Sequence, residues 1–364
     1  MDRREFVQST AAALALSALP RISFAQQLPF DPRVGAWRTY EITTRIDVLK
    51  PAGATRVWVP VPSVEGEYQK VVGNTWSGNG AARHARDGKY GAGMVAAEWG
   101  ATESKPVLEV VSTFSTRNRA VDFKTPDLAL KLDAASAAFY TAATELMPTD
   151  GIVRDTAREI VKGRRTELER ARAIYDWIVE NTFRDPKTRG CGVGDIKAML
   201  ETRNLSGKCA DLNALYVGLA RSIGLPARDV YGLRVVKSDF GYRSLGAGTP
   251  NVTRAQHCRA EVFLTAYGWV PVDPADVRKV VLEEKPQPVT LADPVVPPVR
   301  AKLFGAWEMN WLAYNEAHDI KLPGSSGAPV AFLMYPQAET GGNRLDSLDP
   351  DNFKYTITAR EIKA

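Results

Sequence analysis

The chain has 364 residues, of which 45% are hydrophobic and 24% are charged. This composition is typical of a soluble globular protein with two or three cores, and it excludes a disordered or fibrous chain. The 47 Lys and Arg residues against 42 Asp and Glu residues leave a net charge of +5. Because the basic residues are scattered rather than gathered into runs, we expect no nucleic-acid partner.

Three cysteines and three histidines limit the chemistry available to the chain. Three cysteines cannot form a disulfide framework, and without a CxxC pair or a His cluster they do not predict a conventional zinc site. We therefore expect no metal and no organic cofactor. A catalytic imidazole would have to come from His84, His257 or His318, of which His84 and His318 are predicted to be surface or structural residues.

Residues 1–25 are predicted to be a signal peptide. Arg3 and Arg4 precede an apolar stretch over residues 11–19, which is too short to cross a bilayer permanently. Small residues suit cleavage after Ala25, and the paired arginines resemble a twin-arginine export signal, with a general secretory signal as the alternative. We expect a periplasmic protein with no stable membrane insertion after cleavage, whose oligomeric state the sequence leaves open.

Next along the chain, residues 28–125 are predicted to form an N-terminal β-sandwich domain, because apolar residues alternate with polar ones from Tyr40 to Val48. The period then becomes helical. A capping box at Thr166 predicts a helix that runs to about Asn181. A further helix is predicted between Gly207 and Gly224.

The remaining divisions follow from strands and prolines. Residues 140–285 are predicted to be a catalytic core in which two strands, residues 229–236 and 257–264, follow the last helix. Residues 286–303 read as a Pro-rich linker, and residues 304–364 as a C-terminal β-rich extension. The fold class expected is α+β.

Cys209 begins the helix that follows Gly207, where free backbone N–H groups and the positive end of the helix dipole favour a thiolate. A cysteine at a helix start can equally be a buried small hydrophobic residue. Asp211 by itself opposes the thiolate, so activation requires a neighbouring imidazolium.

His257 begins a strand, and a hairpin turn at Tyr267 brings the chain back antiparallel to it. A carboxylate after that return can hold Nδ1–H of the imidazole and present Nε2 to the thiol. Two carboxylates qualify, Asp273 and Asp276, and a simple four-residue turn favours the second.

These residues resemble the transglutaminase-like superfamily, whose fold is related to that of papain with the order Cys, His, Asp. Three blocks carry the resemblance: Gly-Lys-Cys-Ala-Asp over residues 207–211, His257 with Glu261, and Gly-Trp-Val-Pro-Val-Asp-Pro over residues 268–274. The resemblance covers roughly residues 140–285. It implies that Cys209 is the nucleophile, His257 the general base and then acid, and Asp273 the orienting carboxylate.

One position departs from the pattern of the superfamily. Members often have an aromatic residue two positions after the His, where this chain has Arg259. The arginine either reads an acidic or carboxyl-bearing substrate or is simply solvated. The oxyanion hole requires the Cys209 N–H and a second donor, for which Trp177 and Asn181 are candidates.

Two cysteines and two loops remain. Cys191 and Cys258 are either two inert thiols or a disulfide formed after export, and Cys258 should face away from His257. The Gly-rich residues 189–195 are expected to form a groove wall near Cys209. Residues 237–256 have the composition of a lid.

The sequence supports three functions. The first is a periplasmic cysteine hydrolase, of peptidase or amidase type, that cleaves an amide bond of a peptide or protein through a thioester acyl-enzyme. The second is a transglutaminase, which passes the same acyl group to a primary amine and needs a dry tunnel to do so. The third is a non-catalytic binding scaffold. Loss of a triad residue would indicate it, and none of the three residues is lost.

Overall fold

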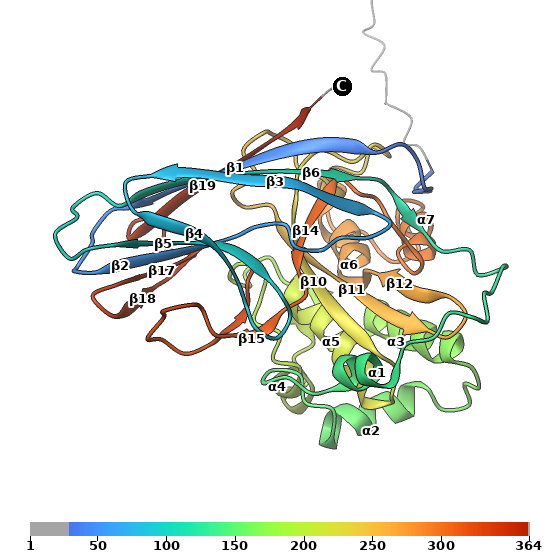
Figure 1. Ribbon diagram of the computed structural model, residues 1–364. Helices are drawn as coiled ribbons and strands as arrows, with labels where there is room; N and C mark the ends of the chain where they lie inside the picture. The colour runs from blue at the N-terminus through green and yellow to red at the C-terminus, as the bar shows by residue number, and fades with distance from the viewer. Residues whose placement is uncertain (1–28, 363–364) are drawn as a thin grey trace, which may run out of the picture.

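The computed structural model describes residues 29–362 and has a β-sandwich beside a mixed α+β core (Figure 1). The predicted signal peptide lies outside the described residues. Among residues 29–362 no helix combines the length and the apolarity that a membrane span requires.

The sandwich is built from two antiparallel sheets. The first has the strand order β19 (Phe353–Ile362), β1 (Arg38–Val48), β6 (Val107–Thr116) and β3 (Gln69–Gly78). The second has the order β18 (Asn343–Leu345), β17 (Gln337–Thr340), β2 (Thr55–Pro60), β5 (Gly93–Trp99) and β4 (Ala81–Arg86). Alternate residues of β1 and β6 face inward, as the alternation from Tyr40 to Val48 predicts.

Residues from the two ends of the chain share this sandwich. In the first sheet β19 pairs with β1 over the ten positions from Thr39↔Ile362 to Val48↔Phe353. In the second sheet β17 pairs with β2. The C-terminal residues are therefore not a separate extension, because their strands provide the backbone partners that β1 and β2 need on one side.

The core contains an antiparallel sheet that helices cover. Its strand order is β12 (Gly268–Val272), β11 (Gln256–Leu264), β10 (Ala227–Arg234) and β14 (Trp311–Asn315). The helices are α1 (Ala134–Thr141), α2 (Gly151–Ile160), α3 (Glu167–Asn181), α4 (Ile196–Thr202), α5 (Cys209–Ser222), α6 (Pro274–Glu283) and α7 (Val296–Lys302).

Helix α5 is the centre of the core. It packs against β10 and β11 on one side and against α2, α3 and α6 on the others, so that nearly all its residues are buried. The Thr166 capping box of α3 is confirmed, and that helix ends at Asn181 as predicted. The proline-rich segment is not wholly extended, because α7 begins at Val296 with prolines in its first turn, where they are tolerated.

Short elements complete the fold. They are β7 (Arg119–Ala120) with β13 (Ala306–Trp307), β8 (Phe183–Arg184) with β9 (Ser206–Gly207), β15 (His318–Ile320) with β16 (Val330–Phe332), and a 3₁₀ turn (Arg243–Leu245). A shared apolar cluster joins the core to the sandwich and contains Leu233 and Leu312 from the core, and Tyr40, Phe114 and Ile357 from the sandwich. This cluster fixes the end of the sandwich against the core sheet.

Candidate active site

Cys209 is the first residue of α5 and is almost completely buried. Helix α5 is held at this end by Asp211, whose carboxylate accepts a hydrogen bond from the Lys208 N–H at 2.9 Å. The sulfur therefore lies where the positive end of the helix dipole stabilises a thiolate.

Asp211 also fixes the glycine-rich loop beside the cysteine. Its Oδ1 accepts the N–H groups of Val193 at 2.9 Å and Gly194 at 3.0 Å. Gly192 has φ 95°, and a Cβ there would lie 1.8 Å from Asp211 Oδ2. The carboxylate that the sequence sets against the thiolate is thus bound to backbone donors, and Gly190 and Cys191 of the loop line the cleft as expected.

His257 and Asp273 come together from adjacent strands. The hairpin of β11 and β12 pairs Leu264 with Gly268, which places Asp273 just beyond the end of β12 and near His257. His257 Nε2 lies 2.7 Å from Asp273 Oδ2. Our expectation that the carboxylate holds Nδ1 is wrong, because Nε2 faces the two carboxylates and Nδ1 is the ring nitrogen left for the thiol.

Asp273 has two further hydrogen bonds that fix its orientation. It is the N-cap of α6, and its Oδ1 accepts the Asp276 N–H at 3.0 Å. The same oxygen accepts the amide of Asn213 at 3.3 Å. Asn213 lies four residues after Cys209 on α5, and this spacing is the sequence signal that could have identified it.

Asp276 also approaches the imidazole, but its main partner is an arginine. Its Oδ2 lies 3.4 Å from His257 Nε2, while its Oδ1 accepts Arg234 Nη2 at 2.5 Å. Burial opposes its ionisation, yet Arg234 and then His257 hold the pKa of Asp276 well below its usual range. Asp276 is therefore a second fixed negative charge beside the imidazole.

The charges around the site favour a thiolate–imidazolium pair. Burial and the Arg234 charge oppose protonation of His257, but Asp276 and Asp273 outweigh them and raise the pKa of His257 to about 9. Hydrogen bonds from the Cys191 and Cys258 thiols, with the nearby His257, hold the pKa of Cys209 well below that of an ordinary thiol. Both shifts favour the charged form of the group concerned.

Three thiols cluster at this point rather than one. Hydrogen bonding to Cys209 and burial raise the pKa of Cys191, and burial followed by the same contact raises that of Cys258. The structure has all three cysteines as free thiols. Cys191 and Cys258 are therefore neighbours of Cys209, although the sequence left them unassigned.

Arg259 was expected either to bind an acidic substrate or to be solvated, and the structure shows neither. Its side chain is only 2% exposed, lies beside the Trp307 and Trp311 rings at 5.3 and 4.7 Å, and donates to the Glu308 carbonyl. Its Nε lies 3.5 Å from Asp273 Oδ2. Arg259 is thus a buried cation behind Asp273, neither solvated nor open to substrate.

The two candidates for a second oxyanion donor lie elsewhere. Trp177 and Asn181 are not among the residues that line the cleft, and the Asn181 amide donates to the Trp177 carbonyl at 2.8 Å. Tyr335 does line the cleft, beside Cys191. It comes from the segment before β17, more than a hundred residues after Cys209, and no local spacing in the sequence indicates it.

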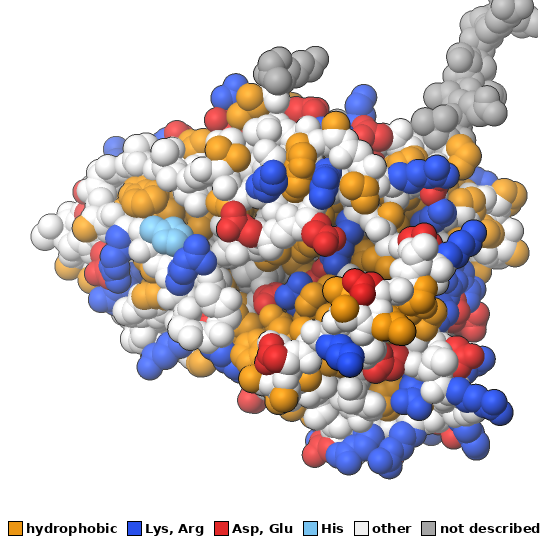
Figure 2. All heavy atoms as spheres, turned by 45° about the vertical axis from the view of Figure 1, so that its right-hand side comes forward, with side chains coloured by type: hydrophobic (Ala, Val, Ile, Leu, Met, Phe, Trp, Pro, Cys, Tyr) orange, Lys and Arg blue, Asp and Glu red, His pale blue; other side chains and the backbone are white. Residues whose placement is uncertain are grey.

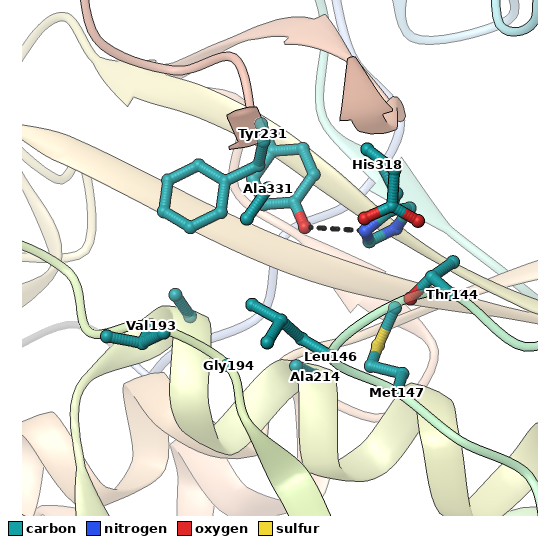
Figure 3. A pocket seen from close by; sticks show the side chains of 12 residues that line it. Thr144, Leu146, Met147, Val193, Gly194, Ala214, Tyr231, His318 and Ala331 are labelled. Carbon is teal, nitrogen blue, oxygen red and sulfur yellow. Dashed lines mark hydrogen bonds between the residues drawn. The ribbon is translucent and has the colours of Figure 1, made fainter. Parts of the chain in front are cut away.

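His318, the third histidine, belongs to a different polar cluster. Figure 3 shows it across a small pocket above α5, where the Tyr231 hydroxyl lies 3.2 Å from its Nδ1. Its Nε2 lies 3.6 Å from the buried Asp229. His318 is therefore a structural residue, while His84 lies on β4.

One group of side chains could in principle ligate a metal. His257, Asp273 and Asp276 bring three donor atoms within 4.8 Å of one another. Arg234 already occupies Asp276, and Arg259 lies beside Asp273. Two adjacent cations disfavour a divalent ion there.

An open cleft of about 860 Å³ gives access to Cys209 and His257. Its lining includes the segment over residues 246–256 and, joined to that segment by backbone hydrogen bonds, β19 with the turn before it. The first of these segments is anchored rather than free, because Glu284 binds Ser244 and β19 binds Thr253. It therefore forms a fixed wall of the cleft.

Comparisons with known proteins identify the family to which the chain belongs. Residues 154–274 match the profile of the transglutaminase-like superfamily. An uncharacterized protein of Haemophilus influenzae is 38% identical over 344 residues, which cover 89% of this chain and 91% of that protein. The chain therefore belongs to the transglutaminase-like superfamily, whose members are usually cysteine-based enzymes.

One solved structure shows the same fold over most of the chain. A proposed cysteine protease from Cytophaga hutchinsonii has a TM-score of 0.51 at 15% identity, covering 90% of this chain and 99% of that chain. The periplasmic domain of TgpA from Pseudomonas aeruginosa has a TM-score of 0.34 at 14% identity, covering 70% and 93%. The first similarity extends over the β-rich flanks as well as the core.

Proposed function

We propose that the protein is an exported cysteine hydrolase, of peptidase or amidase type, that cleaves amide bonds of peptides or proteins. The observation that carries the proposal is the placement of Cys209 at the head of α5, in contact with an imidazole that Asp273 holds at 2.7 Å. Both groups line an open cleft. This set of roles is the one that thiol acyl transfer requires.

In the proposed reaction, the Cys209 thiolate attacks the carbonyl carbon of the substrate amide. The His257 imidazolium gives its Nδ1 proton to the leaving nitrogen, the C–N bond breaks, and a thioester remains on Cys209. Water then attacks the thioester while His257 takes its proton. The C–S bond breaks, the acid leaves, and the thiolate–imidazolium pair is restored.

The surrounding residues each support one step. Asp273 holds the ring in position through Nε2, and Asp276 adds a charge that favours the imidazolium. The Cys209 N–H at the helix start can donate to the oxygen of the tetrahedral intermediate. We propose the Tyr335 hydroxyl as the second donor, because it borders the sulfur-containing end of the cleft.

Hydrolysis is favoured over transfer to an amine by the character of the cleft. Charged side chains such as Lys208 and Arg254 line it, and the cleft is open to solvent. Such a lining retains water, whereas amine transfer needs water to be excluded. Export to the periplasm is proposed from the paired arginines and the apolar stretch near the N-terminus.

The test is to incubate the enzyme with a library of N-acetylated peptides in ¹⁸O-labelled water, with and without millimolar butylamine, and to weigh the products. Hydrolysis places one ¹⁸O in a new carboxyl group, whereas transfer adds the amine. We expect mainly the labelled acid, and no product from the Cys209→Ala variant. A dominant amine adduct would identify a transglutaminase, and no product together with an unreactive Cys209 would support a binding scaffold.

A further inference from the structure

The cleft that leads to Cys209 is lined by basic side chains and by no acidic one. The core contributes Arg184, Lys208, Arg234 and Lys279. The loops and β19 contribute Arg189, Arg254 and Lys354. The outer surface differs, because basic and acidic side chains are interspersed over the face shown in Figure 2.

Three of these cations are neutralised by carboxylates that do not line the cleft. Arg184 pairs with Glu283, Arg189 with Asp346 and Arg234 with Asp276, each at 2.5 Å. They hold the walls together. Their presence alone does not indicate a ligand.

The other cations are not neutralised in this way. Within residues 29–362, Lys208, Arg254 and Lys354 lie within 4.0 Å of no carboxylate oxygen, so that each charge is free to act on the cleft. Lys208 directly precedes the nucleophile, and Arg254 lies three residues before His257. A water-filled cleft whose low-dielectric protein walls carry one sign of charge concentrates ions of the opposite sign.

Lys279 is the most informative of these residues. It lies one turn after Asp276 on α6, its side chain is only 17% exposed, and its nearest carboxylate oxygen, on Glu283, is 3.8 Å away. Burial, followed by the Arg234 charge, lowers the pKa of Lys279 to about 8. A lysine kept largely out of water without a close partner loses solvation that an anionic ligand would restore.

We propose that the cleft selects an acidic acyl donor, a peptide with carboxylate groups next to the scissile amide, and that Lys279 and Arg254 bind those carboxylates. This inference rests on the proposed hydrolase function, because thiol acyl transfer requires an acyl group, which a peptide supplies and an inorganic anion does not. Recognition of an acidic substrate, which the sequence analysis assigned to Arg259, is thereby assigned to Lys279 and Arg254, because Arg259 is buried and these two residues line the cleft.

The test uses a matched pair of probes that alkylate Cys209. In acetyl-Glu-Glu-chloromethyl ketone and acetyl-Gln-Gln-chloromethyl ketone, the side chains lie on the acyl side of the reacting carbon. Cys209 attacks the same methylene carbon in both, the S–C bond forms and chloride leaves, so that only the side-chain charge differs. We expect the Glu probe to react about tenfold faster than the Gln probe at low salt. The ratio should fall toward one at high salt, because screening shortens the range of the field.

Variants locate the preference. Lys279→Gln and Arg254→Gln should each lower the Glu-to-Gln rate ratio about threefold or more, with the Gln probe correcting for any change in the thiol itself. The matched control is Lys105→Gln, an exposed lysine between β5 and β6 that does not line the cleft, and it should leave the ratio unchanged. If Lys279→Gln does not fold, the exposed Arg254 carries the test.

The outcomes separate this inference from the proposed function. A ratio near one in the unmodified protein, or an equal loss in Lys105→Gln, overturns the acidic donor even if peptides are hydrolysed. A tenfold preference that Lys279→Gln and Arg254→Gln remove supports it, even if no peptide is turned over. The peptide-library experiment decides the second question without reference to the first.

Discussion

Two buried histidine–carboxylate pairs lie close to the same helix, and they differ in charge. His257 and Asp273 meet at 2.7 Å beside the head of α5, whereas His318 and Asp229 are 3.6 Å apart and belong to the cluster above α5. All four side chains are almost completely buried. The chemistry of a His–Asp pair is therefore decided by what surrounds it.

The surroundings drive the two imidazoles in opposite directions. Asp276 is a second carboxylate beside His257, and together with Asp273 it raises the pKa of His257 to about 9. Among residues 29–362, Asp229 is the one carboxylate paired with His318, and burial followed by the Arg221 charge lowers the pKa of His318 well below the usual value. Burial raises the pKa of Asp229 to about 7. The first pair therefore favours a protonated imidazole, whereas the second holds an imidazole that resists protonation beside a carboxyl that ionises only as the pH rises through about 7.

The charged residues around each His–Asp pair therefore determine which histidine can assist a thiol. Arg234 lies against Asp276 and Arg259 against Asp273, so that the buried ionic cluster around His257 is tolerated. The Asp229 oxygens have no hydrogen-bond partner among the described residues. Only the first pair is built to hold a charged imidazole.

The largest expected effect on turnover comes from replacing Cys209, the nucleophile beside the His257 cluster. Cys209→Ala should lower turnover by at least about 10⁴-fold, because the nucleophile is lost while binding and oxyanion donors remain. Cys191→Ala is the matched comparison: it removes a thiol that helps to lower the pKa of Cys209, so it should lower turnover far less than loss of the nucleophile itself. Steady-state hydrolysis of a peptide found in the library is the measurement. Equal losses in both variants would show that the cysteine cluster acts as a unit.

The next effect separates the two carboxylates that approach His257. Asp273→Asn should lower kcat by about 10²- to 10⁴-fold, because the ring loses its charged partner. Asp276→Asn should have a milder effect on kcat, but it leaves the buried Arg234 without its carboxylate and should lower the free energy of unfolding by about 3 kcal/mol. Turnover and urea unfolding of both variants are the measurements. The reverse ranking in kcat would give Asp276 the orienting role.

A smaller effect is expected in the pH dependence of thiol reactivity, turnover and stability, because the pKa values of Cys209 and His257 are shifted. Cys209 should react with iodoacetamide with an apparent pKa well below 9, whereas turnover should fall again as the pH rises through about 9, where His257 loses its proton. Because His257 holds its proton more tightly when folded, its contribution to stability is complete below about pH 6.5. That contribution is lost as the pH rises through about 9. An apparent thiol pKa that is not lowered would contradict the ion pair.

The sequence predicts the cluster around His257 but not the one around His318. The first lies on residues whose order and spacing carry the resemblance, and the hairpin at Tyr267 brings Asp273 to His257. Turn geometry alone left Asp273 and Asp276 both open, because the choice depends on how the chain enters α6, and only the resemblance implied Asp273. The ring nitrogen could not be predicted, because it depends on side-chain rotamers.

Other parts of the molecule depend on contacts between distant segments. Arg259 is buried because Trp307 and Trp311 lie beside it, and these follow about fifty residues later. The pairing of β1 with β19 joins the two ends of the described chain and leaves no local pattern. Composition suggests a β-rich C-terminus, but it cannot specify the strand with which each segment pairs.

The smallest effect on rate is expected in the second cluster. Asp229→Asn should change turnover less than about twofold, because the pair with His318 does not line the cleft. Its effect on stability has a definite sign. The folded chain binds the Asp229 proton more tightly than the unfolded chain, so stability falls as the pH rises from about 4 to about 7. Asn cannot ionise and removes this dependence.

At pH 8, Asp229→Asn should therefore unfold at a higher temperature than the unmodified protein, with a gain of about 1 kcal/mol or more, since one pKa unit corresponds to about 1.4 kcal/mol. At pH 4 the gain should disappear. Thermal unfolding followed by circular dichroism at the two pH values is the measurement, and turnover of the same sample is the control for the site. A tenfold loss of turnover would join this cluster to the catalytic one, and an equal gain at both pH values would mean that folding does not raise the pKa of Asp229.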